Sequence, residues 1–371
     1  MISSEFDDIR PYTDAELPEV LRKATAMPSF TRVASFLFPG TPVQQTAQRL
    51  INSRSVDELQ LTLMKELLER IMAESITEFT FSGLENISPS EPHLFISNHR
   101  DITLDAFLLQ YILRLNGHST CYITFGANLM EEPLLTELGR CNKMFRVERG
   151  GSRAEFYKAL MHLSRFIRHV VCEERESLWT AQRNGRTKDG LDRTDPALLK
   201  MLAHSSPLPP AEALAELNIV PIAVSYEWEP CDILKAMELS ATAASGEYHK
   251  RPGEDLASVV EGLRAPKGRV HISICKTLDA DALSSCRDSA GTTAFYEQAA
   301  SLIDRRIISG YRLWPNNYIA HDLRSGSQQF ANSYTDDQRR QFEQRTTMLS
   351  KDALRPFLDI YANPVDSLKL I

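Results

Sequence analysis

A histidine and two aspartates lie close together in the segment 97–105, which reads SNHRDITLD. A carboxylate that accepts a hydrogen bond from one imidazole nitrogen fixes the tautomer, so the other nitrogen can take a proton from a hydroxyl. A histidine that merely ties down a turn is the structural alternative, and for an isolated pair it is the more common case. The spacing therefore predicts that His99 is a general base, provided that other segments supply a ligand site beside it.

Two carboxylates compete as the partner of this histidine. Asp101 can cap the helix that follows, whereas Asp105 falls in its first turn and can reach back to the imidazole. We expect Asp105 to be the partner and keep Asp101 as the alternative. The triplet His-Arg-Asp also occurs in protein kinases, but the required Asn five residues after the Asp is Ala106 here, and no DFG or glycine-rich loop accompanies it.

A basic stretch at 139–153, GRCNKMFRVERGGSR, follows further along the chain. A short strand runs into Arg149 and a Gly-Gly turn, after which a helix begins near Ser152. Arginines and the free N–H groups of a helix N-terminus together bind phosphate, so Arg149 and Arg153 are candidate ligands for a phosphorylated substrate. A solvated basic loop is the alternative interpretation.

A second basic turn lies in 177–188, SLWTAQRNGRTK, where no acidic residue occurs. An apolar strand here leads into a turn that contains Arg183, Gly185, Arg186 and Lys188. In a chain whose net charge is -7, two cationic turns that each follow a strand indicate a site for an anionic ligand.

The elements that must position these residues are short β-prone runs alternating with helical patterns. We predict strands at 77–81, 94–96, 121–125, 143–147, 177–181, 219–224 and 270–275, and helices at 103–115, 129–138, 152–169, 211–217 and 292–308. This alternation predicts an α/β fold, a largely parallel mixed sheet flanked by helices. Polar residues that follow such strands gather at the carboxyl edge of the sheet.

Helical patterns precede and follow this region. We therefore predict three parts: an N-terminal helical region (1–75), an α/β domain (76–310) and a C-terminal helical extension (311–371). Within the first part, 30–40 is apolar and either packs on the main domain, which we favour, or rests on a membrane. Other expected features are a helix cap at 41–42, a helix at 55–72, a long connection at 183–210, and C-terminal helices at 335–350 and 351–361.

Composition narrows the class of protein. A chain of 371 residues with 43% hydrophobic and 25% charged residues can bury a full core. Its negative net charge argues against a nucleic-acid partner. Six cysteines without CxxC spacing favour reduced thiols in the cytoplasm. The chain shows neither a signal pattern nor a transmembrane run, so if it works on lipid, it is expected to reach the bilayer peripherally, from its inner face.

Four segments in this order resemble the glycerolipid acyltransferase superfamily, which includes the glycerol-3-phosphate and 1-acylglycerol-3-phosphate acyltransferases. That family has an Asn/Ser-His-x4-Asp block, a Phe-x-x-Arg-like block, a Glu-Gly-Thr-Arg-like block and a Val-Pro-Val/Ile strand. The counterparts here are Asn98-His99 with Asp105, then 147–149, 182–186 and 220–222.

The resemblance implies transfer of an acyl group from acyl-CoA or acyl carrier protein to a hydroxyl of glycerol-3-phosphate or lysophosphatidate, in phospholipid biosynthesis. It implies His99 as the base oriented by Asp105, no bound cofactor and no metal. The substrate-binding residues that it implies are Asn98, Arg149, Arg153, Arg183, Gly185, Arg186 and Lys188, and Pro221 is a structural motif residue.

Two departures from the family pattern leave alternatives open. Five residues, not four, separate His99 from Asp105, and Gln182 or Asn184 stands near the place of the family's Glu. An amide adds no charge, so the acceptor could be another lysolipid, such as a lyso-aminolipid. A catalytically inactive lipid-binding paralogue is a second alternative. A serine hydrolase is disfavoured because the GxSxG motif is absent.

Overall fold

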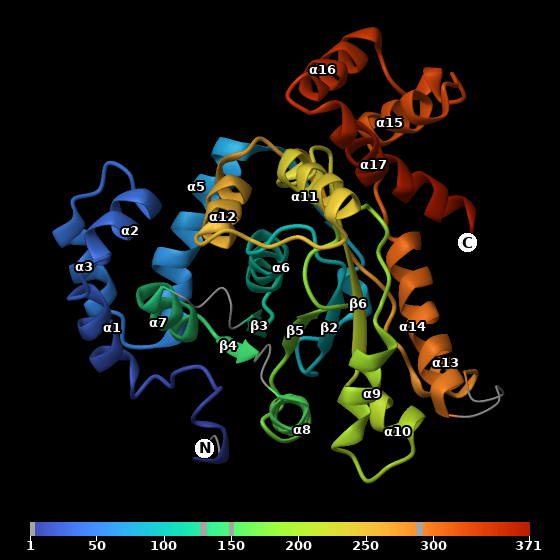
Figure 1. Cartoon of the computed structure of the whole chain (residues 1–371). Coiled ribbons are helices and arrows are strands. Elements are labelled where there is room, and N and C mark those ends of the chain that lie inside the picture. The colour runs from blue at the N-terminus through green and yellow to red at the C-terminus, as the bar shows by residue number, and fades with distance from the viewer. Residues whose placement is uncertain (1–3, 127–131, 148–151, 287–291) are drawn as a thin grey trace.

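One mixed sheet forms the centre of the molecule. The computed structural model describes residues 4–126, 132–147, 152–286 and 292–371, and its strands follow the order β1-β7-β6-β2-β5-β3-β4 (Figure 1). All neighbours are parallel except β6 and β7, which are antiparallel. The strands are β1 (Ile76–Ser82), β2 (Leu94–Ser97), β3 (Tyr122–Gly126), β4 (Met144–Val147), β5 (Leu178–Ala181), β6 (Ile219–Tyr226) and β7 (Gly268–Ile274).

The central strands are apolar because both faces of the sheet are covered. Every residue of β2 and β6 is buried, which is typical of parallel strands that lie between two layers of helices. The seven strands predicted from the sequence are all present, with ends that differ by two residues at most. The predicted α/β class with a largely parallel mixed sheet is therefore confirmed.

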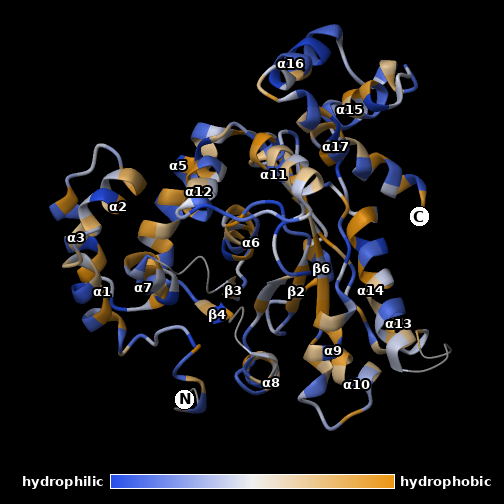
Figure 2. Cartoon of the chain, viewed as in Figure 1, coloured by the Kyte–Doolittle hydropathy of each residue, from blue (hydrophilic) through white to orange (hydrophobic). Residues whose placement is uncertain are grey.

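Helices cover both faces of this sheet (Figures 1 and 2). One face packs against α6 and the N-terminal helices, and the other packs against α8, α9 and α14. The helices of this part are α6 (Leu104–Leu115), α7 (Pro133–Cys141), α8 (Arg153–Arg168), α9 (Pro196–His204), α10 (Pro210–Ala215), α11 (Asp232–Ser245), α12 (Glu254–Arg264), α13 (Ala280–Ser284) and α14 (Thr292–Ser309).

The segment 183–210, predicted to be a long connection, contains helix α9. Asp195 caps this helix by accepting a hydrogen bond from the backbone N–H of Ala197, and Pro196 occupies its first turn. Its buried residues Leu199 and Leu202 join the core beside α8. The prediction was wrong here because neighbouring prolines and serines masked a short amphipathic helix. Helices α11 and α12, between β6 and β7, were also not predicted.

The N-terminal helices belong to the core of the sheet. Phe30, Ala34 and Phe38 are buried in the same cluster as α6, so the segment 30–40 packs on the main domain. The expected helix at 55–72 is interrupted by a π-helical turn, Gln60–Met64. The helices are α1 (Leu17–Thr25), α2 (Phe30–Leu37), α3 (Val43–Ile51), α4 (Val56–Leu59) and α5 (Lys65–Ser75), and Pro42 rather than Thr41 takes the N-cap of α3.

The C-terminal helices have an aromatic core of their own. They are α15 (Pro315–Ser325), α16 (Asp336–Thr346) and α17 (Leu354–Lys369). Phe342, Phe357 and Tyr361 pack together there, and Ala236 of α11 completes the cluster. Within the four described ranges, no helix is both long enough and apolar enough to cross a membrane.

Candidate active site

The turn between β2 and α6 carries the histidine that the sequence singled out. The Nδ1 atom of His99 lies 2.9 Å from Oδ2 of Asp105, and the His99 side chain is 14% exposed. Because the carboxylate can only accept, the bond assigns the proton to Nδ1 when the imidazole is neutral. The Nε2 atom forms no hydrogen bond to any described residue, so it is available to a ligand.

Asp105 is held by several hydrogen bonds at once. Its Oδ2 also accepts the backbone N–H groups of Arg100, at 2.6 Å, and Asp101, at 2.9 Å, while its Oδ1 accepts the hydroxyl of Tyr226 at 2.8 Å. Burial and the nearby Asp105 charge raise the pKa of Tyr226 far above its ordinary value, so its hydroxyl remains a donor. The backbone thus curls around the carboxylate, which accommodates the five-residue spacing.

Asp101 caps the helix that follows the turn and does not contact His99. Its Oδ1 accepts the backbone N–H groups of Thr103 and Leu104, both at 2.9 Å, and so caps α6. Its Oδ2 is buried, has no hydrogen-bond partner among the described residues and faces Gly262 of α12, where an added Cβ would lie only 2.3 Å away. Asp105, not Asp101, is therefore the residue that contacts His99.

Asn98 lies in the core rather than in a ligand site. Its side-chain amide donates to Asp192, at 2.9 Å, and to the carbonyl of Val224, at 3.0 Å, while its oxygen accepts the N–H of Val224 at 2.7 Å. The side chain is fully buried, and both amide hydrogens are used. We therefore correct the prediction that Asn98 binds substrate: it links β2 to β6 behind the His99 turn.

The loop after β5 is tied to the histidine turn. The backbone N–H of Thr187 donates to the carbonyl of His99 at 2.7 Å. Beside it, Nη1 of Arg186 is buried and has no hydrogen-bond partner in the described part of the chain. Gly185 has a φ of 78°, a backbone conformation that glycine adopts readily. The backbone of this loop is therefore bonded to the turn that carries the base, and the guanidinium of Arg186 in the same loop lies near the thiol of Cys231.

The other predicted cations of this loop are already paired. Arg183 lies 3.9 Å from the carboxylate of Asp189, and the Lys188 ammonium forms an ion pair with Glu238 of α11. Arg149 and the side chain of Arg153 lie outside the described residues, so the second predicted block stays a prediction. Pro221 sits in β6 opposite Ile96 of β2, in the buried centre of the sheet.

Sequence reasoning missed a buried charge network behind the site. Arg100 donates to Asp192 at 2.6 Å and contacts Glu229 at 3.4 Å, and Lys235 donates to Glu229 at 2.7 Å. Burial alone would raise the pKa of Asp192, but the Arg100 charge and several hydrogen bonds hold that pKa below its usual value. Two cations and two anions thus balance one another within the core.

Trp179 of β5 is a further neighbour that the sequence did not single out. Its ring meets the His99 imidazole edge-on, with the ring centroids 5.6 Å apart. Asp105 holds the imidazole through Nδ1, and the packing of Trp179 against the ring also limits how far the imidazole can tilt.

An apolar cavity of about 670 Å³ opens beside the start of α6. Thr103 and Phe107 of that region form part of its wall, and Lys250 and Arg251 also line it. The apolar residues around it come from five different parts of the chain and include Leu37, Met64, Leu67, Ile71, Phe125, Leu135, Leu138, Met144, Leu256, Val259 and Leu263.

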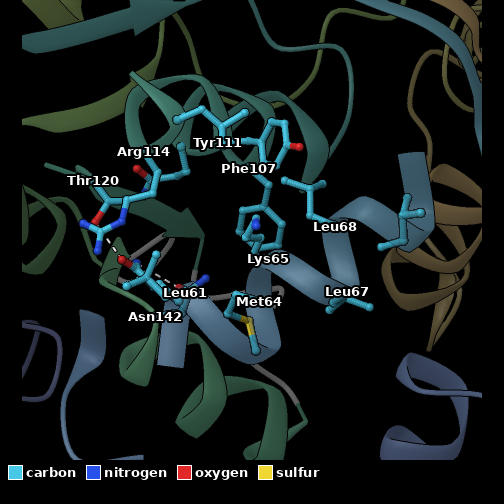
Figure 3. Close-up of a pocket in the computed structure, with 14 residues that line it drawn as sticks. Leu61, Met64, Lys65, Leu67, Leu68, Phe107, Tyr111, Arg114, Thr120 and Asn142 are labelled. Atoms are coloured by element: carbon cyan, nitrogen blue, oxygen red, sulfur yellow. Dashed lines mark hydrogen bonds between the residues drawn. The ribbon is translucent and has the colours of Figure 1, made fainter. Parts of the chain in front are cut away.

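A smaller pocket of about 70 Å³ adjoins this cavity (Figure 3). Met64 and Phe107 line both spaces, and the π-helical turn Gln60–Met64 forms one wall. Thr120 donates to the Gln60 side chain, which in turn donates to Asn142 at 3.0 Å, and these bonds close its polar end. The apolar space therefore continues between α5 and α6.

No group of three or more His, Cys, Asp or Glu side chains in the described ranges is arranged to hold a metal ion.

Comparison with known proteins gives a family match over the central segment. The acyltransferase family model matches residues 78–181. The solved structure of the 1-acyl-sn-glycerophosphate (LPA) acyltransferase PlsC from Thermotoga maritima aligns with a TM-score of 0.42 and 11% identity, covering 80% of this chain and 97% of that one. A search of curated protein sequences finds no match. The matched segment runs from within β1 to the end of β5 and includes β2 and α6.

Proposed function

We propose, from the match of residues 78–181 to the acyltransferase family model, that this chain transfers a fatty acyl group from acyl-CoA or acyl carrier protein to a hydroxyl of glycerol-3-phosphate or lysophosphatidate. The observation that carries the proposal is the 2.9 Å contact between His99 and the buried Asp105, with Nε2 left open. Such a pair suits proton abstraction from a hydroxyl.

The reaction is a direct transfer in this proposal. Nε2 of His99 takes the proton of the acceptor hydroxyl as its oxygen attacks the thioester carbonyl. The tetrahedral intermediate then collapses, the new ester forms and the carbon–sulfur bond breaks. The imidazolium returns the proton to the departing thiolate, which leaves as a free thiol, so neither a metal nor a covalent enzyme intermediate is required.

Two features support the proposed binding of the substrates. The buried Nη1 of Arg186 has no hydrogen-bond partner among the described residues and can bind the acceptor's phosphate, and Arg183 of the same loop can assist. The cavity of about 670 Å³ is lined largely by apolar side chains and begins at Thr103, in the turn that follows His99, so it suits the acyl chain. We also propose peripheral association with the inner face of the membrane, where a lipid acceptor lies.

The segment 182–186, the counterpart of the family's Glu-Gly-Thr-Arg-like block, supports a second class of acceptor. Where the family has Glu, this chain has only amides nearby, and Gln182 is fully buried, with neither polar atom of its side chain hydrogen bonded to a described residue. Asn184, the other amide, is exposed. The loss of a negative charge at this position makes a lyso-aminolipid a reasonable alternative acceptor.

An acceptor and donor panel tests the proposal. Purified protein is mixed with labelled acyl-CoA or acyl carrier protein and with glycerol-3-phosphate, lysophosphatidate or a lyso-aminolipid, and the labelled product is resolved. Product from one of the phosphate acceptors supports the main proposal, and product from the lyso-aminolipid alone supports the alternative. Lipid binding without transfer to any acceptor would identify an inactive paralogue and contradict both.

A further inference from the structure

A basic cleft lies on the opposite face of the sheet from His99. It has a volume of about 600 Å³ and is lined by residues from the ends of β1 and β7 and from the end of α14. Val270, Ile272 and Ile274 of β7 belong to the cluster that contains Trp179, so the alternating residues His271 and Ser273 project from the other face. His99 contacts Trp179, and the cleft is therefore separate from the proposed active site.

Four cations line this cleft, and none of them is paired with an acid. Lys276, Arg305, Arg306 and Arg312 have no carboxylate within 4.0 Å among the described residues, and Glu85 is the one acidic residue in the described lining. Unpaired clustering of this kind is unexpected in a chain whose net charge is -7. The four like charges repel one another, and a bound anion would relieve that repulsion.

Of the four cations, Arg306 is the best example of a partly buried charge without a direct ion pair. It is half-buried, its guanidinium donates only to the backbone carbonyls of Lys276 and Thr277, and burial lowers its pKa. Desolvation of a charged group is unfavourable unless an opposite charge compensates it. Asp279 attracts this guanidinium from a longer distance, but no carboxylate of the described residues lies within 4.0 Å of it, so the cation is fixed beside the cleft without a direct ion pair.

The floor of the cleft is polar rather than apolar. Ser82 hydrogen bonds to Nε2 of His271 at 3.1 Å and donates to the hydroxyl of Ser273 at 3.4 Å, and Ser273 donates to the carbonyl of Gly310 at 2.7 Å. Gly310 suits this close approach, because a Cβ there would lie 3.0 Å from Ala223 and 3.1 Å from Ser273, closer than most such contacts. The hydrogens of both hydroxyls are used in these bonds, so the attraction for an anion comes from the arginines and the lysine above this polar floor.

We propose that this cleft binds a ligand bearing at least two phosphate charges, through Lys276, Arg305, Arg306 and Arg312. Guanidinium groups bind phosphate in a bidentate manner, and the lysine adds a point charge. Either a free phosphorylated molecule or the headgroup of an anionic lipid has this chemistry. The proposal does not depend on acyl transfer, since it involves none of the residues of the His99 site.

The test measures binding to the full chain near 0.1 M salt, where long-range charge effects are screened. Pyrophosphate is titrated by calorimetry, and sedimentation is measured with phosphatidic acid vesicles and with phosphatidylcholine vesicles. The variant Lys276→Glu/Arg312→Glu changes two exposed residues of the cleft. The matched control Lys200→Glu/Lys351→Glu alters net charge equally at exposed sites elsewhere.

We expect the wild type and the control to bind pyrophosphate, and the cleft variant to bind it at least about tenfold more weakly. Binding to phosphatidic acid vesicles without binding to pyrophosphate would assign the site to a lipid headgroup. Absence of binding to both probes, or an equal loss of binding in the control, would overturn the proposal. Thermal unfolding of both variants verifies that each is folded.

Discussion

The ammonium group of Lys235 donates a hydrogen bond to the backbone carbonyl of Arg100 at 2.7 Å, although 135 residues separate the two in sequence. The same peptide group carries the backbone N–H of Asp101, which donates a hydrogen bond to Asp105. A buried lysine of α11 thus polarises a peptide whose other end holds the partner of His99. Bonds linked in this way strengthen one another.

Loss of this lysine should destabilise the fold. Lys235 is 1% exposed and also bonds to Glu229, so Lys235→Met leaves a buried carboxylate with only its longer contact to Arg100. We expect a loss of about 3–5 kcal/mol in the free energy of unfolding, measured with urea. The double variant Lys235→Met/Glu229→Gln removes both charges and should recover part of that loss. No recovery would show that the pair is not coupled.

The two aspartates of the turn should behave differently. Asp105→Asn replaces an acceptor that holds His99, so we expect kcat to fall by about 10² to 10⁴-fold. Asp101→Asn keeps the oxygen that caps α6 and changes only the atom that has no partner, so kcat should stay near the wild-type value. Steady-state kinetics on both variants checks this. A comparable loss of kcat in Asp101→Asn would contradict the assignment.

Arg186 should act on the binding of the acceptor. Arg186→Ala removes the unpaired buried nitrogen and is expected to raise the KM for the phosphorylated acceptor by about tenfold or more, with a smaller change in kcat. Arg183→Ala is the matched comparison, because Arg183 already lies near Asp189, and its effect should be smaller. An unchanged KM in Arg186→Ala would remove this residue from the phosphate site.

Stability should fall as the medium becomes acidic. Burial lowers the pKa of His93 and of His271 below the ordinary value of 6.5, so the unfolded chain binds protons at a pH where the folded chain does not. The free energy of unfolding therefore decreases as the pH drops below about 6.5. Urea unfolding at about pH 7.5 and about pH 5 measures this decrease.

Between these two pH values, the free energy of unfolding should decrease less in His93→Gln than in the wild type. The variant His249→Gln, at an exposed histidine, should show the same decrease as the wild type. The same pH dependence in His93→Gln and in the wild type would exclude His93 as a source of the effect.

The sheet could be predicted because β1 alternates apolar and polar residues and the central strands are short apolar runs followed by polar residues. The His99–Asp105 contact could also be predicted, since both residues lie within one turn and the first turn of the next helix. Helices α11 and α12 were missed because their alanine and charged residues give a weak apolar stripe.

The residues that support the turn could not be inferred from spacing. Tyr226, Glu229 and Lys235 lie more than 100 residues from the turn in sequence and reach it only through the pairing of β2 with β6. Asn98 has the residue type of a ligand contact, and only the fold shows that its amide is used by β6 and Asp192.

Acyl transfer by the His99→Ala variant tests the central claim most directly. The substitution removes the imidazole, which is largely buried but makes few bonds besides that to Asp105, so we expect a folded protein with an unchanged unfolding transition. The account predicts that transfer from the donor preferred by the wild type falls by about 10² to 10⁴-fold. Near-normal turnover in a folded His99→Ala protein would contradict it.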